Sequence, residues 1–237
     1  MFGKNIIYPS EILAKRGLRR TPSPDLMSML TSEGILAKVN TKEVYSEVTI
    51  DLDDLIGTGD SDQKIRDELE KSKYKSSRRR LAALTITNIL DSDPNATVIY
   101  FGPSVEDSKQ VASLLLMFGK SACHISAETS RGRREQVIRE FKEGKVRVIC
   151  NCELLTTGFD APRISHVVIG RPTTSPVLYS QMVGRGIRGK KFGGTDVCEI
   201  TLIKDNFKRS GIATEEIWEM VGELFLLWKE NSNTQAA

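Results

Sequence analysis

The sequence predicts an α/β protein built around a doubly wound parallel sheet. From residue 97 onward, short apolar runs alternate with longer segments in which apolar residues recur at helical spacing. The runs are continuously apolar, as in Val98 to Phe101, and this is typical of strands buried on both faces of a parallel sheet. Strands that alternate with helices indicate a sheet covered by helices on its two sides.

The first part of the chain contains fewer clear elements. Prolines break the chain between Thr21 and Asp25, and Asp25 is a candidate N-cap for a short helix. Polar and apolar residues alternate from Val44 to Leu52, which predicts a half-buried strand of an edge or antiparallel kind. A polar loop follows, and we expect two helices over residues 63–73 and 77–91.

The second part of the chain carries the regular alternation of strands and helices, together with the glycine and proline residues that mark where helices end or begin. Gly119 and Gly144 end two helical patterns, as glycine does at a helix C-terminus, and Pro176 suits the first turn of another helix. The expected strands are 98–101, 122–125, 146–150, 166–169 and 198–203. The expected helices are 105–118, one that begins at Thr129 or Ser130, 176–186, and a final amphipathic helix over 217–228.

Composition narrows the class of protein without naming a partner. The 237 residues carry a net charge of only +3, and no apolar run is long enough to cross a membrane. The sequence has no signal-peptide pattern, and a reducing cytoplasm fits its cysteine usage. Cys123, Cys150, Cys152 and Cys198 form no Cys-x-x-Cys pair, so we expect free thiols and no bound metal.

Although the net charge is low, the basic residues gather in four clusters. They lie at residues 16–20, 78–80, 131–134 and 185–191. Each cluster alone is typical of a solvated surface, but four of them beside the motifs below favour contact with phosphate groups.

The most specific pattern is the string from Gln181 to Arg188, in which Arg185 and Arg188 lie three residues apart. On a helix, this spacing would place both guanidinium groups on one face. Arginine offers a rigid fork of donors that suits phosphate oxygens, and a pair of them can clamp the transition state of phosphoryl transfer.

Two glycine patterns in the same region match motifs of other functions in their letters but not in their structural context. Gly184-x-Gly186-x-x-Gly189 matches the dinucleotide-binding pattern, which would suit a dinucleotide or nucleotide-sugar enzyme. That pattern needs a strand before it and a helix after it, whereas here a helix precedes it. The stretch also nearly matches a nucleotide-binding phosphate loop, but Lys191 stands where a Ser or Thr would hold magnesium.

Together, three segments resemble motifs IV, V and VI of superfamily 2 helicases of the DEAD/DEAH type. Motif IV corresponds to Thr97–Ser104, motif V to Thr156–Pro162 and motif VI to Gln181–Arg188, and the resemblance extends to Asp205. It implies that residues 95–237 are the second RecA-like motor lobe, and that residues 1–94 are the tail of the first lobe with a connecting segment. The amino-acid sequences of motifs V and VI resemble those of the DNA-directed members of the family, so DNA is favoured over RNA as the partner.

The resemblance also assigns roles at the nucleotide. Gln181, Arg185 and Arg188 would be catalytic and would reach across a cleft to ATP held by the first lobe. Gly158 and Asp160 would contribute to the same ATP site. ATP and Mg²⁺ would be held mainly by the first lobe, so we expect this chain alone to be inactive as an ATPase.

The remaining assignments concern the nucleic acid. Ser104, Thr129, Arg131 and Thr157 would contact the strand, with Gly158 beside Thr157. Ser104 has an equally good interpretation as the N-cap of the following helix. An alternative for the whole chain is a RecA-like module that binds nucleic acid without ATPase activity.

Overall fold

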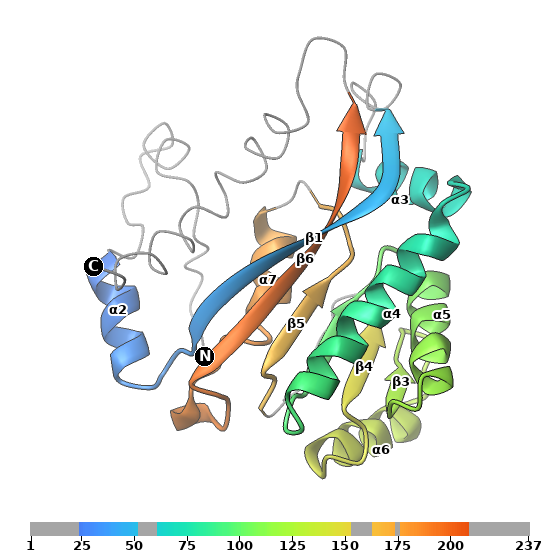
Figure 1. The fold of residues 1–237 in the computed structure, drawn as a ribbon. Coiled ribbons are helices and arrows are strands. Elements are labelled where there is room, and N and C mark those ends of the chain that lie inside the picture. Colours follow the sequence, from blue (N-terminus) through green and yellow to red (C-terminus); the bar gives the residue numbers. More distant parts are fainter. Residues whose placement is uncertain (1–23, 52–60, 153–162, 174–175, 209–237) are drawn as a thin grey trace.

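The computed structural model describes residues 24–51, 61–152, 163–173 and 176–208, and they form a six-stranded sheet flanked by helices (Figure 1). The strand order is β1-β6-β5-β2-β4-β3, and every neighbouring pair is parallel. The strands are β1 (Lys38–Asp51), β2 (Val98–Phe101), β3 (Ala122–His124), β4 (Val148–Asn151), β5 (His166–Ile169) and β6 (Val197–Lys208). The predicted parallel α/β fold is confirmed.

Helices cover both faces of this sheet, as a doubly wound fold requires. Buried residues of α4 and α5 share one core cluster with the sheet, and those of α6 and α7 share the other. The helices are α2 (Pro24–Ser32), α3 (Ser61–Lys71), α4 (Lys75–Ser92), α5 (Val105–Met117), α6 (Arg131–Lys142) and α7 (Pro176–Val183), with a short 3₁₀ helix η1 (Lys190–Phe192).

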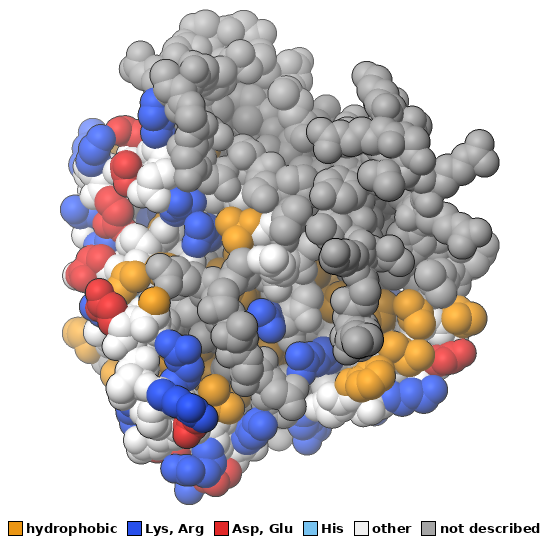
Figure 2. All heavy atoms as spheres, turned by 180° about the vertical axis from the view of Figure 1, so that it is seen from behind, with side chains coloured by type: hydrophobic (Ala, Val, Ile, Leu, Met, Phe, Trp, Pro, Cys, Tyr) orange, Lys and Arg blue, Asp and Glu red, His pale blue; other side chains and the backbone are white. Residues whose placement is uncertain are grey.

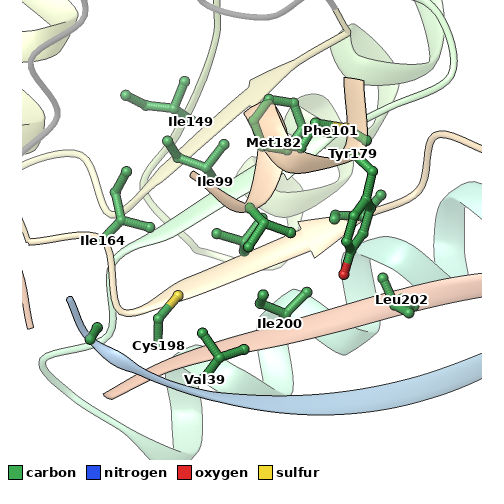
Figure 3. Close-up of a cluster of buried hydrophobic side chains, with 14 of the residues drawn as sticks. Val39, Ile99, Phe101, Ile149, Ile164, Tyr179, Met182, Cys198, Ile200 and Leu202 are labelled. Carbon is green, nitrogen blue, oxygen red and sulfur yellow. The ribbon is translucent and has the colours of Figure 1, made fainter. Parts of the chain in front are cut away.

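The core is built from the two faces of the central strands. All four residues of β2 are fully buried, with Ile99 and Phe101 in one cluster and Val98 and Tyr100 in the other. Figure 3 shows the first cluster, in which Met182 of α7 lies among side chains of the sheet. The continuous apolar runs of the sequence therefore mark strands with no exposed face.

The cysteines of the central strands belong to this core as free thiols. Cys150 and Cys198 are fully buried, and burial together with the nearby charge of Glu199 raises the pKa of the Cys198 thiol to about 12. All four cysteines are described residues, and none of them forms a disulfide, as predicted. Buried neutral thiols pack as small apolar groups.

The first strand differs from its prediction in direction and length. β1 begins at Lys38 and pairs with β6 in parallel at the edge of the sheet, so the edge position is right and the antiparallel alternative is wrong. Its alternation is as expected, since Ser46, Val48 and Ile50 are buried and Glu47 and Thr49 are exposed. Alternation of polar and apolar residues shows only that one face of the strand is solvated. Parallel and antiparallel edge strands share this property, so alternation does not determine the direction.

The boundary predicted at residue 95 does not divide the described residues into two units. β1 is a strand of the common sheet, and α4 packs on that sheet with Ala82, Ala83, Ile86 and Leu90 in the shared core. β1 and α4 thus share the sheet and the core with elements that follow residue 95. Their assignment as the tail of a first lobe stays a prediction.

Other element boundaries also moved. α7 ends at Val183 instead of continuing through the arginines, and β6 continues to Lys208. The amphipathic helix predicted over 217–228 lies outside the described residues. Among the described helices, none has the length and apolar character needed to cross a bilayer.

Candidate nucleotide and nucleic-acid site

The parallel sheet brings the end of β2, which belongs to motif IV, and the end of β4 to one edge. β2 ends at Phe101 and β4 ends at Asn151, and the two strands are neighbours in parallel register. The backbone N–H of Gly102 donates to the Asn151 carbonyl over 2.7 Å, which ties the two strand ends together. Ligands of open α/β sheets bind at this carboxyl edge. Thr157, Gly158 and Asp160 follow β4 but lie outside the described residues.

Ser104, the motif IV serine, begins α5 at this edge. Its hydroxyl oxygen accepts a hydrogen bond from the Asp107 N–H over 2.9 Å, so the N-cap interpretation is confirmed. The same hydroxyl donates to Glu70 Oε1 over 2.5 Å. A carboxylate of α3 therefore lies where the resemblance expects a nucleic-acid phosphate, and the phosphate contact stays a prediction.

Thr129 and Arg131 lie in the turn that begins α6. The Thr129 hydroxyl accepts from the Ser126 N–H over 3.0 Å, and Ser130 caps the helix. Arg131 is almost fully exposed, and its Nε donates to Glu135 Oε1 over 2.8 Å. That hydrogen bond and the Glu135 charge raise the pKa of Arg131. An exposed arginine at a helix start can meet a phosphate, and its role as a nucleic-acid contact stays a prediction.

Arg171 connects the loop after β5 to the end of β4. Its Nη1 donates to the Cys152 carbonyl over 2.5 Å, one residue past β4. The sequence patterns did not indicate this contact. Its partner is a backbone atom, and every residue has such an atom, so the sequence pattern does not predict the contact.

Arg185 and Arg188 lie beyond the end of α7, Arg185 in a turn and Arg188 in an isolated β-bridge. α7 ends at Val183, and the Gly186 N–H donates to the Val183 carbonyl over 2.9 Å in a tight turn. Gln181, on the last turn of α7, is exposed. The expected placement of both arginines on one helical face is therefore wrong, because the chain leaves the helix at Val183 and turns over residues 184–186.

The two guanidinium groups nevertheless act on each other electrostatically. Burial lowers the pKa of Arg185, and the positive charge of Arg188 lowers it further. Within the described part of the chain, the buried Nε of Arg185 has no hydrogen-bond partner. Arginine side chains with shifted pKa values are a feature that phosphate-binding sites share.

Residues just before β1 hold this turn in place. The Ala37 N–H donates to the Ile187 carbonyl over 2.9 Å, and the Gly189 N–H donates to the Ile35 carbonyl over 3.0 Å. Leu36 and Arg188 form an antiparallel β-bridge between these two bonds. The early part of the chain therefore fixes the backbone of the second arginine.

The glycines that matched the dinucleotide pattern have packing roles. A Cβ on Gly186 would collide with the Cys198 thiol and would lie 2.7 Å from Cγ2 of Val167. At Gly189, a Cβ would collide with the backbone of Gly34. Helix α7 precedes the pattern and η1 and β6 follow it, so the strand-then-helix context of a dinucleotide site is lacking here.

The basic cluster at residues 78–80 is largely buried, which corrects the interpretation of a solvated surface. Arg78 and Arg79 have only 2% and 6% of their side chains exposed. Arg78 forms a two-pronged ion pair with Asp205, with bonds of 2.8 and 3.0 Å, and donates to the Gly170 carbonyl over 2.5 Å. Arg79 pairs with Asp107 and Glu70. These arginines connect α4 to the site edge of the sheet.

Other cationic side chains remain on the surface. Figure 2 shows the side of the molecule opposite to Figure 1, with Lys and Arg side chains distributed over it among polar and hydrophobic groups. The described residues contain no group of three or more His, Cys, Asp or Glu side chains that could hold a metal ion.

The parallel sheet with helices on both of its faces is a RecA-like α/β fold. Residues 78–190 match the helicase conserved C-terminal domain family. This segment, a little under half of the chain, therefore carries the C-terminal domain of the helicases.

The curated relatives are consistent with this family. A "51.5 kDa protein" of Lactococcus phage (isolate 7-9) is 30% identical over 148 residues, which are 62% of this chain and 31% of the relative. The putative ATP-dependent helicase IRC3 of Saccharomyces cerevisiae is 36% identical over 85 residues, 35% of this chain and 12% of the relative. CshA of Bacillus subtilis, 28% identical over 109 residues (46% of this chain, 22% of the relative), is named a DEAD-box ATP-dependent RNA helicase. The chain thus spans less than a third of the length of each.

A solved structure shares the fold. The crystal structure of T4 UvsW superimposes with a TM-score of 0.57 at 12% identity, covering 83% of this chain and 40% of that chain. At this identity the likeness concerns the fold alone.

Proposed function

We propose that this chain is the second motor lobe of an ATP-dependent nucleic-acid helicase or translocase. In this function, Arg185 and Arg188 bind phosphate oxygens of ATP held by a first lobe, and Gln181 contacts the γ-phosphate or the attacking water. Gly158 and Asp160 of motif V contribute to the same nucleotide site.

The observation that carries the proposal is the pair of Arg185 and Arg188. Burial lowers the pKa of Arg185, and the positive charge of Arg188 lowers it further. Guanidinium groups of this kind suit the oxygens of a triphosphate and the charge that develops on the transferred phosphoryl group. Backbone bonds to Ile35 and Ala37 hold the backbone on either side of Arg188.

ATP supplies the phosphoryl group, and Mg²⁺ neutralises part of its charge. Arg185 and Arg188 suit the phosphate groups of ATP, since they offer guanidinium donors. Carboxylates in a metal-binding arrangement are lacking in the described ranges, and the sequence carries no complete phosphate-binding loop. We therefore expect the first lobe to hold ATP and Mg²⁺, and this chain alone to hydrolyse no ATP.

The nucleic acid would lie along the carboxyl edge of the sheet, near Ser104, Thr129, Arg131 and Thr157. Contacts there would go mainly to phosphates, so affinity should fall as salt rises. Closing and opening of the two lobes around ATP would move this edge along the strand. DNA is the proposed partner because motifs V and VI resemble DNA-directed members, and RNA is the competing outcome of the binding test.

The test is ATP hydrolysis stimulated by single-stranded DNA, measured on the helicase that contains this chain together with its ATP-holding lobe. Arg188→Ala should lower turnover by about 10³- to 10⁵-fold, as removal of an arginine finger does in phosphoryl-transfer enzymes. The matched control is Arg139→Ala, which removes the same charge from the exposed side of α6 and should leave turnover within about twofold.

Three outcomes separate the alternatives. Loss of turnover in Arg188→Ala alone supports the motor and its arginine finger. Turnover that does not depend on Arg188 would refute the finger assignment. An unmodified protein that binds single strands without any hydrolysis would be the binding module without ATPase activity.

A further inference from the structure

A carboxylate of α3 bridges two donors at the nucleic-acid edge of the sheet. Glu70 Oε1 accepts from the Ser104 hydroxyl over 2.5 Å, and Glu70 Oε2 accepts from Arg79 Nη2 over 2.6 Å. The two donors come from different elements, since Ser104 begins α5 and Arg79 lies in α4. Together they form a small receptor for an anion with two oxygens.

A phosphodiester group has the same chemical features as the bound carboxylate. Both groups share one negative charge between two oxygens, and both accept charge-assisted hydrogen bonds from arginine. The receptor lies at the start of α5, a helix of 13 residues, where negative charge is favoured by the helix dipole. Arg79 is 6% exposed, so its guanidinium is already oriented and desolvated.

Glu70 can leave this receptor without unfolding its surroundings. It is the penultimate residue of α3, its side chain is 30% exposed, and three rotatable bonds allow it to turn into solvent. Arg79 would keep its second partner, because its Nε also donates to Asp107 Oδ2 over 3.2 Å. Departure of Glu70 therefore exposes the Nη2 donor and the Ser104 hydroxyl without leaving a buried charge unpaired.

We propose that Ser104 and Arg79 form a binding site for one backbone phosphate of the nucleic acid, and that Glu70 occupies this site in the free chain. The inference rests on the proposed function and adds Arg79 and Glu70 to it. Glu70 competes with the nucleic-acid strand for this site and so lowers the affinity of the chain for the strand. Binding of the strand displaces the Glu70 carboxylate from Ser104 and Arg79.

The experiment measures binding of a fluorescent oligothymidylate by anisotropy over a range of salt concentrations. Glu70→Gln removes the competing charge, and about tenfold tighter binding is expected, the size of one charge-assisted hydrogen bond gained. One additional phosphate contact should also steepen the plot of log affinity against log salt by about 0.7. A change that only loosens the fold cannot produce this gain.

Two further variants separate the site from general electrostatics. Glu68→Gln removes the same charge from the same helix, where Glu68 pairs with Lys71, and should change affinity by less than about twofold. Ser104→Gly in the Glu70→Gln background removes the hydroxyl, while glycine keeps most of the N-cap stability. This double variant should lose most of the gain, and thermal unfolding of each variant confirms that it is folded.

The outcomes distinguish this inference from the proposed function. If the unmodified chain binds and Glu70→Gln behaves like Glu68→Gln, the phosphate site is refuted and the proposed function stands. A gain in Glu70→Gln that persists after Ser104→Gly would also refute the site. If neither the unmodified chain nor Glu70→Gln binds DNA or a matched oligouridylate, the nucleic-acid function itself fails.

Discussion

The buried ion pair between Arg78 and Asp205 allows a quantitative test of how this fold is held together. The side chains are 2% and 0% exposed, and Asp205 also accepts from the Ser46 hydroxyl over 2.5 Å. Burial opposes the charge on Arg78, but the charge and hydrogen bonds of Asp205 outweigh burial and raise the pKa of Arg78. The pair joins α4, β1 and β6, so we expect its disruption to destabilise the whole lobe.

The expected loss follows from leaving a charge buried without its partner. In Asp205→Ala, Arg78 would lose both carboxylate bonds and Ser46 would lose its acceptor, and such changes cost about 3–5 kcal/mol. A domain of ordinary stability has about 5–15 kcal/mol in total, so this single change removes a large share. Replacing both partners, as in Arg78→Met with Asp205→Leu, should restore most of the stability, because no buried charge remains.

Urea unfolding followed by circular dichroism measures these differences, and an unchanged slope against urea shows that stability itself has changed. The control is Lys42→Ala, which breaks an exposed pair with Glu199 and should cost less than about 1 kcal/mol. If Asp205→Ala costs no more than Lys42→Ala, the pair does not stabilise the fold. If the double replacement is as unstable as Asp205→Ala, the loss does not come from an unpaired charge.

Two further predictions concern packing and pH. Gly186→Ala should lower the free energy of unfolding by about 1–3 kcal/mol because its Cβ would meet Cys198 and Val167, whereas Gly132→Ala in α6 has open space and should raise it by about 0.5–1 kcal/mol; equal effects in urea unfolding would contradict the packing argument. Burial lowers the pKa of His166, so the folded state binds the proton less tightly than the unfolded state. Its contribution to stability is complete above the unfolded pKa of about 6.5 and is lost as pH falls toward the lower folded pKa. Urea midpoints at pH 7 and pH 5.5 should therefore differ less in His166→Gln than in the unmodified chain, and an unchanged difference would refute this.

The positions of the central strands could be predicted because burial on both faces restricts them to apolar residues. The run from Val98 to Phe101 contains no polar interruption, and the structure buries all of it. The direction of β1 could not be predicted in the same way. Its alternation reports only that one face is solvated, while its direction is set by pairing with β6, near the opposite end of the described chain.

The nature of the cluster at residues 78–80 was also beyond prediction from local sequence. A run of arginines is usually solvated, and nothing near it in the sequence indicates a buried acid. The partner of Arg78 is Asp205, which the sheet brings to α4 by placing β6 between β1 and β5. Identifying such a pair requires the tertiary fold, because burial of each charge depends on the presence of the other.

At the arginine motif, the local geometry differs from the one that residue spacing predicted. The spacing of Arg185 and Arg188 predicted a shared helical face, but α7 ends at Val183 and the chain turns over residues 184–186. The turn is held by backbone bonds to Ile35 and Ala37, and any residues with free N–H and carbonyl groups could make them. Such bonds are invisible to a search for side-chain patterns. They also mean that the segment before β1, which carries no motif, fixes the position of Arg188, so changes there should act on the proposed nucleotide site without touching the nucleotide.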